Sequence, residues 1–453
     1  MHLLEPKTTE LVACAPTPLD VSLERLRTLT SPLTGVVARV GETLRMTDDA
    51  RMVKVGASLA DQAALVGMEL SNHAGGASHD RSAAVAAAIG EAVERYAASY
   101  LPTERICTGS AREVAGAIDP GRFALFADEQ YRHPAFPFER FTADTRLGWI
   151  DGLALPGGAP VRVPAQLVFM SFEVATLLGE PRIGYTTSNG LACGPSREEA
   201  ILNALCEALE RDAFVLTWEN RLSLPLLDWR GHAELTRYAS RYFDPSGLSF
   251  GAVDLSVFWN VPTVLGVVRN AGEGATLGVG ASCAPTIEAA WRTALKEAFA
   301  VHAWARTEHF ESPPRTFEAD FSDLTDFVDH IVLHSDPANR DVAAFLDAST
   351  ATRHTRDVPQ IPSGTAFDSI AAICERLAEK GLSAYAVDVT TVDIRQAGLH
   401  VWKVVVPELC ALNATHVARF CGGRRLYHAA HDLGLVERPL TFAELNHYPH
   451  PFP

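Results

Sequence analysis

Residues 188–214, SNGLACGPSREEAILNALCEALERDAF, contain the pattern that decides the fold of this chain. A stretch of small residues is followed by an Ala-rich run that favours a helix. Near the end of that run stands Glu207-Ala208-Leu209-Glu210-Arg211. Helix positions i, i+3 and i+4 share one face, so this string would present two carboxylates and a guanidinium together. The stretch therefore predicts a glycine-containing loop followed by a helix with an acidic face.

The same arrangement occurs at two other places in the chain. Residues 74–78, AGGAS, precede a helix-forming run with Glu91-Ala92-Val93-Glu94-Arg95. Residues 278–282, GVGAS, precede a third such run, which carries Arg292 and Glu297. The first two units share the pattern ExxER. Three units of this kind predict that two or three acidic helix faces converge in the fold.

Converging carboxylates suit a metal ion. Mg²⁺ prefers oxygen ligands, keeps several waters and is usually completed by the phosphates of a substrate. Arg95, Arg211 and Arg292 would then bind phosphate oxygens through paired hydrogen bonds. Backbone N–H groups of the glycine-rich loops would add further donors. The pattern thus indicates a site for a metal-bound triphosphate.

A simpler interpretation of each acidic string is a solvated salt-bridge face, which is the usual role of a single ExxER on a helix. Here, however, the string occurs twice in runs that are otherwise almost entirely apolar, at 84–89 and 200–206. A buried glutamate needs a partner or a metal. The pattern alone leaves both interpretations open. The sequence has no Walker A string and no GxGxxG in a strand-helix unit, which argues against a conventional P-loop enzyme.

Strand-like and helix-like runs alternate along the chain and predict an α/β or α+β fold. The strand-like runs lie at 36–40, 161–168, 263–268, 384–389 and 401–406. The helix-like runs lie at 23–29, 83–100, 198–218, 287–306 and 366–380. Residues 307–345 have weak periodicity and several turn residues, which are typical of a surface insertion.

The composition argues against several functions. The chain has 39 Lys and Arg against 55 Asp and Glu, a net charge of −16, which is unsuited to broad nucleic-acid binding. Its apolar runs fall short of the roughly 18 residues that a membrane-spanning helix needs. The eight cysteines are far apart, with no CxxC pair and no zinc-type spacing, as is typical of buried thiols in a reducing cytosol. We therefore expect a globular, cytoplasmic protein.

The end of the sequence, Pro449-His450-Pro451-Phe452-Pro453, is a second clue. Alternating prolines favour an extended backbone at little entropic cost and exclude helix or interior strand. A carboxylate at Pro453 would be an acceptor held at the end of a stiff strut. Composition alone equally allows a flexible tail or a ligand for a proline-binding domain.

Together these strings resemble the YcaO family. The resemblance rests on GEAVERY at 90–96, TSNGLACG at 187–194 and EALERDAF at 207–214, and PHPFP at 449–453 is similar to the PxPxP ending of azoline-forming members. It implies an N-terminal extension at 1–65, an α/β (α+β) YcaO-type ATP-binding catalytic domain at 66–440 and a Pro-rich tail at 441–453. It also implies an ATP-dependent cyclodehydratase with Mg²⁺, which converts Cys, Ser or Thr of a ribosomally made precursor peptide to azolines. In that chemistry ATP phosphorylates the peptide amide oxygen and becomes ADP and phosphate.

The resemblance implies roles for individual residues. The metal ligands or orienters of the triphosphate would be Glu91, Glu94, Glu207, Glu210 and Glu297. Asn203 and Arg292 fall where the family has nucleotide contacts. Pro449, Pro451 and Pro453 would form a tail that reaches the active site and assists proton transfers. The chain departs from the family at Ala77, Ala87 and Ala300, where Lys, Ser and Gln are common.

Two other functions stay open at this point. A YcaO protein can make thioamides or macroamidines, although the PHPFP ending counts against this. The three alanine departures also allow a catalytically silent subunit that binds a peptide or partner. For the cyclodehydratase we expect a precursor peptide as substrate and a separate leader-peptide-binding partner protein, and a homodimer is allowed. Nucleic acid and membrane are not expected as partners.

Overall fold

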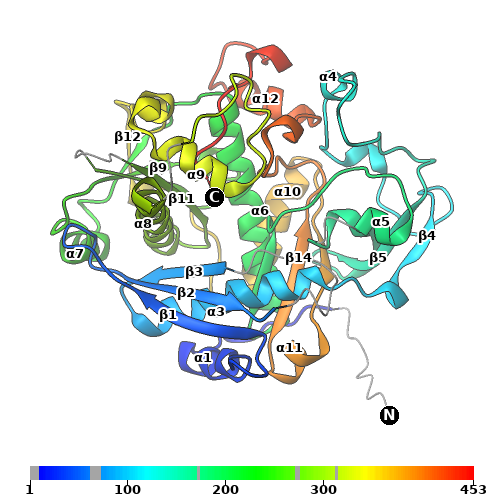
Figure 1. Ribbon diagram of the computed structural model, residues 1–453, viewed down its shortest axis with the longest axis horizontal. Coiled ribbons are helices and arrows are strands. Elements are labelled where there is room, and N and C mark those ends of the chain that lie inside the picture. The colour runs from blue at the N-terminus through cyan, green and yellow to red at the C-terminus, as the bar shows by residue number, and fades with distance from the viewer. Residues whose placement is uncertain (1–9, 62–72, 171–173, 271–275, 312–314, 453) are drawn as a thin grey trace.

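The computed structural model describes residues 10–61, 73–170, 174–270, 276–311 and 315–452. Its strands form three sheets, and three long helices pack between and against them (Figure 1). This combination of helices with mainly antiparallel strands confirms the α/β (α+β) class expected from the sequence. Among the described residues, no helix combines the length and the apolar character needed to cross a membrane.

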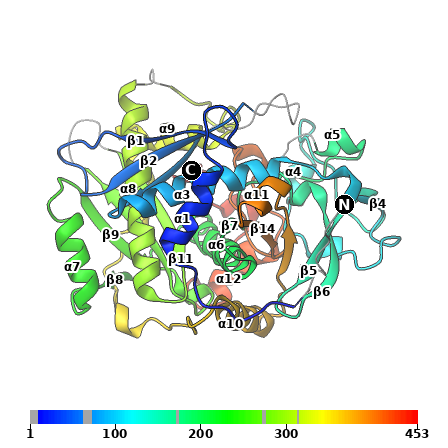
Figure 2. The same cartoon turned by 90° about the horizontal axis from the view of Figure 1, so that it is seen from below.

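The first sheet carries the first acidic helix. It has the order β1 (Val37–Thr43), β2 (Val53–Leu59), β3 (His73–Ser78), with both pairs antiparallel. Helix α3 (Arg81–Ser99) packs on β3 and β2, and α1 (Leu19–Thr28) packs against α3 (Figure 2). Residues 37–59 thus help to build the sheet that supports α3.

The second sheet carries the third helical unit. Its order is β11 (Leu277–Cys283), β10 (Thr263–Arg269), β9 (Ser249–Asp254), β8 (Leu226–Asp228) and β12 (Thr352–His354). Helix α8 (Ile287–Glu311) lies on β10 and β11, and α7 (Ala233–Tyr242) lies between β8 and β9 in the chain. The register of β10 against β11 runs without interruption from Thr263 opposite Cys283 to Arg269 opposite Leu277.

The third sheet and helix α6 (Arg197–Glu219) form the centre of the molecule. The strand order is β4 (Cys107–Gly109), β5 (Leu147–Ala154), β13 (Tyr385–Asp388), β14 (His400–Val405) and β7 (Leu191–Gly194), and β6 (Ala159–Pro164) pairs with β5. Helix α6 contacts β7 and β14 of this sheet and β11 of the second sheet. The largest apolar core surrounds α6, where Leu209, Ala213, Phe214 and Leu216 are fully buried.

The prediction of three glycine-rich loops was wrong. The segments are the strands β3, β7 and β11, and only residues 188–190 form a turn. A Cβ atom on Gly76 would lie 2.5 Å from the carbonyl oxygen of Ala84, and one on Gly194 would lie 2.6 Å from the nitrogen of Ala200. The glycines and alanines therefore let each helix backbone approach its strand closely, which no larger side chain would allow.

The remaining α-helices of the described residues are shorter than α3, α6 and α8. They are α4 (Asp128–Tyr131), α5 (Val174–Leu178), α9 (Phe327–Ser335), α10 (Ala366–Glu379), α11 (Val392–Gln396) and α12 (Arg424–Asp432). The strand expected at 161–168 is shorter than predicted, because β6 ends at Pro164 and a 3-10 turn follows. The surface insertion expected at 307–345 was wrong: α8 runs on to Glu311, and α9 buries Ile331 and Leu333.

Candidate active site

The first glutamate of each ExxER string ties its helix to the glycine-containing segment before it. On α3, Glu91 Oε2 accepts the backbone N–H of Gly75 at 2.8 Å and Oε1 pairs with Arg95 at 2.6 Å. On α6, Glu207 Oε2 accepts the N–H of Gly190 at 2.9 Å and Oε1 pairs with Arg211 at 3.1 Å. The amides of Gly75 and Gly190 therefore bind these carboxylates rather than being left for a phosphate.

Each of the two helices begins at a side chain that caps its N-terminus. Asp80 Oδ1 accepts the N–H of Ala83 at 2.9 Å at the start of α3. Ser196 Oγ accepts the N–H of Glu199 at 3.2 Å at the start of α6. A side-chain acceptor at this position satisfies one of the free N–H groups of the first helical turn.

The second glutamate of each string points into the molecule. Glu94 Oε1 accepts the N–H of Cys193 at 2.7 Å, so this side chain of α3 reaches strand β7 of another sheet. Glu210 lies 3.1 Å from Nε of Arg211, and only 9% of its side chain is exposed. Glu94 thereby ties α3 to β7, the strand that precedes α6.

The five predicted glutamates form one electrostatic cluster, which we call the carboxylate cluster: Glu91, Glu94, Glu207, Glu210 and Glu297. Burial raises the pKa of Glu94 well above its usual value, and the charges of Glu207 and Glu91 raise it further. Burial likewise raises the pKa of Glu210, with added contributions from Glu297 and Glu207. The pKa of Glu297 on α8 is raised by burial to about 7. The structure thus brings the acidic faces of α3, α6 and α8 together.

Cations from several elements oppose this charge. Arg95 pairs with Glu91, and the charge of Lys296 acts on Glu297. Arg211 contacts both Glu207 and Glu210. Lys403 on β14 faces Glu207, is almost fully buried, and donates from Nζ to Thr186 Oγ1 at 3.1 Å and to the carbonyl oxygen of Thr187 at 2.8 Å. Burial lowers the pKa of Lys403 to about 8. Sequence analysis missed Lys403, although a single lysine within the apolar run VWKVVV at 401–406 is a signal for it.

The donor set suits Mg²⁺ bound to a triphosphate. Buried carboxylates whose pKa values are raised by one another are stabilised by a divalent cation. Mg²⁺ commonly takes one or two carboxylates and fills its remaining positions with water and phosphate oxygens. Across the part of the chain that the structure describes, no three His, Cys, Asp or Glu side chains lie close enough to hold an ion by themselves.

Two other predicted nucleotide contacts lie on helices that carry members of the carboxylate cluster. Asn203 is exposed, one helical turn before Glu207 on α6. Arg292 on α8 pairs with Glu234 of α7 at 3.0 Å, and its guanidinium carbon lies 5.3 Å from the centre of the Tyr238 ring. Both assignments stay predictions.

The end of the chain reaches the cluster. Phe452 is almost fully buried, its ring centre is 4.8 Å from that of Phe214, and the guanidinium carbon of Arg211 lies 4.3 Å from its ring centre. An aromatic face at this distance attracts a guanidinium. Pro449 and Pro451 are buried, whereas Pro453 lies outside the described residues.

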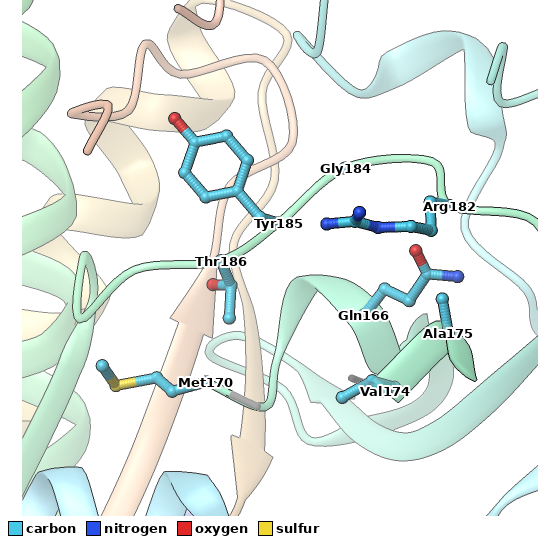
Figure 3. A pocket seen from close by; sticks show the side chains of 8 residues that line it. All are labelled: Gln166, Met170, Val174, Ala175, Arg182, Gly184, Tyr185 and Thr186. Carbon is cyan, nitrogen blue, oxygen red and sulfur yellow. The ribbon is translucent and has the colours of Figure 1, made fainter. Parts of the chain in front are cut away.

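A small hollow adjoins the cluster through Lys403. It is lined by Met170, Val174, Tyr185 and Thr186, among others (Figure 3). Thr186, whose hydroxyl accepts the bond from Lys403, stands at one side of it. The hollow lies beside the carboxylates and is not formed by them.

Comparisons with known proteins agree on the class of this chain. A family model described as YcaO cyclodehydratase, ATP- and Mg²⁺-binding, matches residues 75–410. An uncharacterized protein of Methanothermobacter thermautotrophicus is 30% identical over 212 residues, which cover 46% of this chain and 51% of that protein.

Two solved structures share the fold. A heterocyclase in complex with substrate and cofactor has a TM-score of 0.78 at 24% identity, covering 98% of this chain and 59% of that chain. YcaO from Methanopyrus kandleri, bound with AMPPCP and Mg²⁺, has a TM-score of 0.60 at 22% identity, covering 87% and 91%. The matches therefore cover little more than half the length of the Methanothermobacter protein and of the heterocyclase.

The fold and the family match together define an ATP- and Mg²⁺-binding protein with the fold of the heterocyclases. The chain belongs to the YcaO family, as its motifs predicted. ATP and Mg²⁺, the cofactors expected from the sequence, are confirmed by the family description.

Proposed function

We propose that this chain uses ATP to form azoline rings in a ribosomally made precursor peptide. The side chain of a Cys, Ser or Thr attacks the carbonyl carbon of the preceding residue, and the carbonyl oxygen takes the γ-phosphoryl group of ATP. The attack closes the ring, and phosphate then leaves with that oxygen while the amide nitrogen loses its proton and forms the C=N bond. Each ring therefore costs the peptide one water and converts one ATP to ADP and phosphate. This is the chemistry implied by the azoline-forming YcaO resemblance.

The observation that carries the proposal is the contact between Phe452 and Arg211. It joins the PHPFP segment, which is the motif similar to azoline-forming members, to the carboxylate cluster. In this proposal the carboxylate cluster would hold Mg²⁺ ions, with one or two carboxylates to each ion, and water and phosphate oxygens would fill the remaining positions. Ions bound in this way would neutralise charge on the phosphates. Arg211 keeps Glu207 and Glu210 in place, and Lys403 holds a proton at Nζ beside Glu207.

The first test concerns the cofactor site. Ligand that binds only the folded protein stabilises it by about 2.7 kcal/mol at a hundredfold excess over the dissociation constant. Glu207→Gln and Glu210→Gln should lose most of this stabilisation by Mg-ATP in thermal denaturation. Glu199→Gln is the matched control, because Glu199 lies on the same helix but bonds to Thr17 and Ser196. Equal stabilisation in all three variants would contradict the assignment.

The second test concerns the product. Precursor peptide, ATP and Mg²⁺ should give a peptide lighter by one water per ring, located by fragmentation at a Cys, Ser or Thr. Thioamide formation would raise the mass, and a macroamidine would place the lost water at an amine rather than at such a side chain. Absence of ATP-dependent modification with every candidate peptide would indicate a silent subunit.

The tail is proposed to act in the same site. Pro449, Pro451 and Pro453 would hold an extended segment that assists proton transfers during ring closure. Deleting residues 449–453 should reduce ring formation at least about tenfold, equal to roughly 1.4 kcal/mol of barrier, while Mg-ATP binding survives. Wild-type ring formation by the truncated chain would contradict this role.

We also propose a separate leader-binding partner protein. Residues 19–59 of this chain contribute α1, β1 and β2 to the support of α3, so this part of the chain is already used in the fold. Adding such a partner should strongly raise turnover of a leader-bearing peptide. Full-rate processing by the isolated chain would contradict the proposal.

A further inference from the structure

Three consecutive carbonyl groups near the end of the chain accept hydrogen bonds from aromatic ring nitrogens. Trp218 Nε1 of α6 donates to the carbonyl oxygen of Tyr448 at 2.9 Å. His334 Nε2 lies 2.8 Å from the carbonyl oxygen of Pro449, and His330 Nδ1 lies 2.8 Å from that of His450. The two histidines are one turn apart on α9, and both are buried.

This segment depends on side-chain donors because of its own sequence. Proline has no backbone N–H, so the alternating prolines of PHPFP prevent a regular strand ladder. Its carbonyl groups are nevertheless buried, and a buried carbonyl without a donor is costly. The three ring nitrogens supply these donors at successive positions.

Histidine suits this position because it donates without adding charge. Burial lowers the pKa of both His330 and His334 to about 4, so both rings are neutral at pH 7. A neutral imidazole carries one N–H. The observed distances assign that hydrogen to Nε2 of His334, and to Nδ1 of His330, whose other nitrogen lies farther, at 3.2 Å, from the carbonyl oxygen of Ala414.

The ring of His450 adds two further contacts between the tail and the rest of the molecule. It stacks on the ring of His330 with centres 4.0 Å apart and planes inclined by 14°. Its Nε2 lies 3.0 Å from the carbonyl oxygen of Asn413. Two residues further on, Phe452 packs against Arg211 of the α6 ExxER string. The contacts of α9 therefore determine where Phe452 meets the carboxylate cluster.

We propose that His330 and His334 are positioning residues, which fix the carbonyl groups of His450 and Pro449 so that Phe452 stays against Arg211. The effect on ring formation rests on the proposed function, whereas the effect on the tail does not. Both histidines come from residues 307–345, outside the strings that carry the family resemblance.

The test compares variants with and without a donor at the same place. His330→Leu and His334→Leu replace the imidazole ring with an apolar side chain that has no N–H to donate. His330→Asn and His334→Gln restore it, because the amide nitrogens of Asn and Gln occupy about the positions of Nδ1 and Nε2. His302→Leu is the control: His302 is a buried histidine of α8 whose ring nitrogens hydrogen-bond to none of the described residues.

Hydrogen exchange of the full chain reads out the tail directly. In the leucine variants, peptides covering residues 445–452 should exchange at least about tenfold faster, while α3 is unchanged and the Asn and Gln variants behave like wild type. Unaltered exchange of the tail in both leucine variants would overturn the inference, whatever their activity.

Kinetics then test the link to catalysis. The leucine variants should lose at least about tenfold in kcat for ring formation, with the KM for Mg-ATP within about twofold, and the Asn and Gln variants should recover most of kcat. A tail that exchanges faster without any loss of kcat would overturn the positioning role. A wild-type chain that forms no rings would contradict the proposed function, and the exchange measurement would then still decide whether the histidines fix the tail.

Discussion

The two ExxER strings, on α3 and on α6, have the same local structure in different surroundings. In each, the first glutamate accepts a backbone N–H from the preceding glycine-containing segment and pairs with the arginine four residues later. On α3 that pair is partly open to solvent, with 35% of the Glu91 side chain and 27% of the Arg95 side chain exposed. On α6 the corresponding values are 21% and 16%. The same ExxER pattern thus lies nearer the surface on α3 and nearer the centre of the molecule on α6.

The residue after each string shows how the surroundings differ. After the α3 string, the hydroxyl of Tyr96 donates to Asp393 of α11 at 2.7 Å. After the α6 string, Asp212 is fully buried and accepts from Arg425, from the indole of Trp259 and from the backbone of Cys410. A local motif therefore fixes which groups share a helix face, while burial decides the energetic weight of each group.

The largest expected difference comes from removing the two arginines. Arg211→Ala removes the guanidinium that pairs with both Glu207 and Glu210, so we expect the unliganded protein to lose about 3–5 kcal/mol of unfolding free energy. Arg95→Ala affects a more exposed pair and should cost about 1 kcal/mol or less. Denaturant unfolding measures both, and Mg-ATP should recover part of the Arg211→Ala loss. Equal losses would show that the two strings are not distinguished by burial.

A second substitution tests the claim that both units are built alike. Gly76→Ala and Gly194→Ala each place a Cβ within 2.6 Å of helix backbone atoms, so each should cost about 1–3 kcal/mol. Gly75→Ala is the matched control on β3, because its Cβ would meet nothing closer than 3.9 Å and should change stability by no more than about 0.5 kcal/mol. Similar unfolding free energies for Gly75→Ala and Gly76→Ala would contradict the close-approach explanation.

The pH dependence of cofactor binding should follow the buried carboxylates. Burial raises the pKa of Glu297 to about 7, and a metal ion binds the deprotonated form, so protons compete with Mg-ATP. The affinity should rise between pH 5 and about pH 7, by up to about tenfold per unit for each proton released. The same raised pKa means that the unliganded fold holds an extra proton between about pH 4.5 and 7 and loses stability as pH rises through that range.

Calorimetric titrations across this pH range check the expectation. Glu297→Gln should flatten the dependence, and Glu91→Gln, which alters the more exposed string, should leave most of it. An affinity for Mg-ATP that is the same at pH 5.5 and pH 7.5 would rule out protonated carboxylates in the unliganded site.

A small effect is expected at the edge of α3. Tyr96→Phe removes the hydrogen bond to Asp393 but keeps the ring, so it should cost about 1 kcal/mol of unfolding free energy. Thermal and denaturant unfolding measure this loss, and Mg-ATP binding should stay unchanged. A loss comparable to that of Arg211→Ala would mean that contacts of α3 and of α6 contribute similarly to the unfolding free energy.

Much of the candidate site follows from short-range pattern. Helix periodicity places Glu207, Glu210 and Arg211 on one face, and the recurrence of the string indicates that such faces converge. The interpretation of the glycines failed because a glycine that permits close helix packing and a glycine in a loop look the same in sequence. Lys403 was missed for a similar reason: the sequence shows a lysine in an apolar strand but not the carboxylate that faces it.

The amino-acid sequence by itself determined the α/β class, the acidic faces of α3 and α6 and the YcaO membership, because each depends on residues close together in the chain. Only the tertiary structure decided which string is central, that Phe452 covers Arg211, and that His330 and His334 hold the tail. His330 and His450 are 120 residues apart, and such contacts are set by the packing of whole helices and sheets. Local periodicity carries no information about that packing.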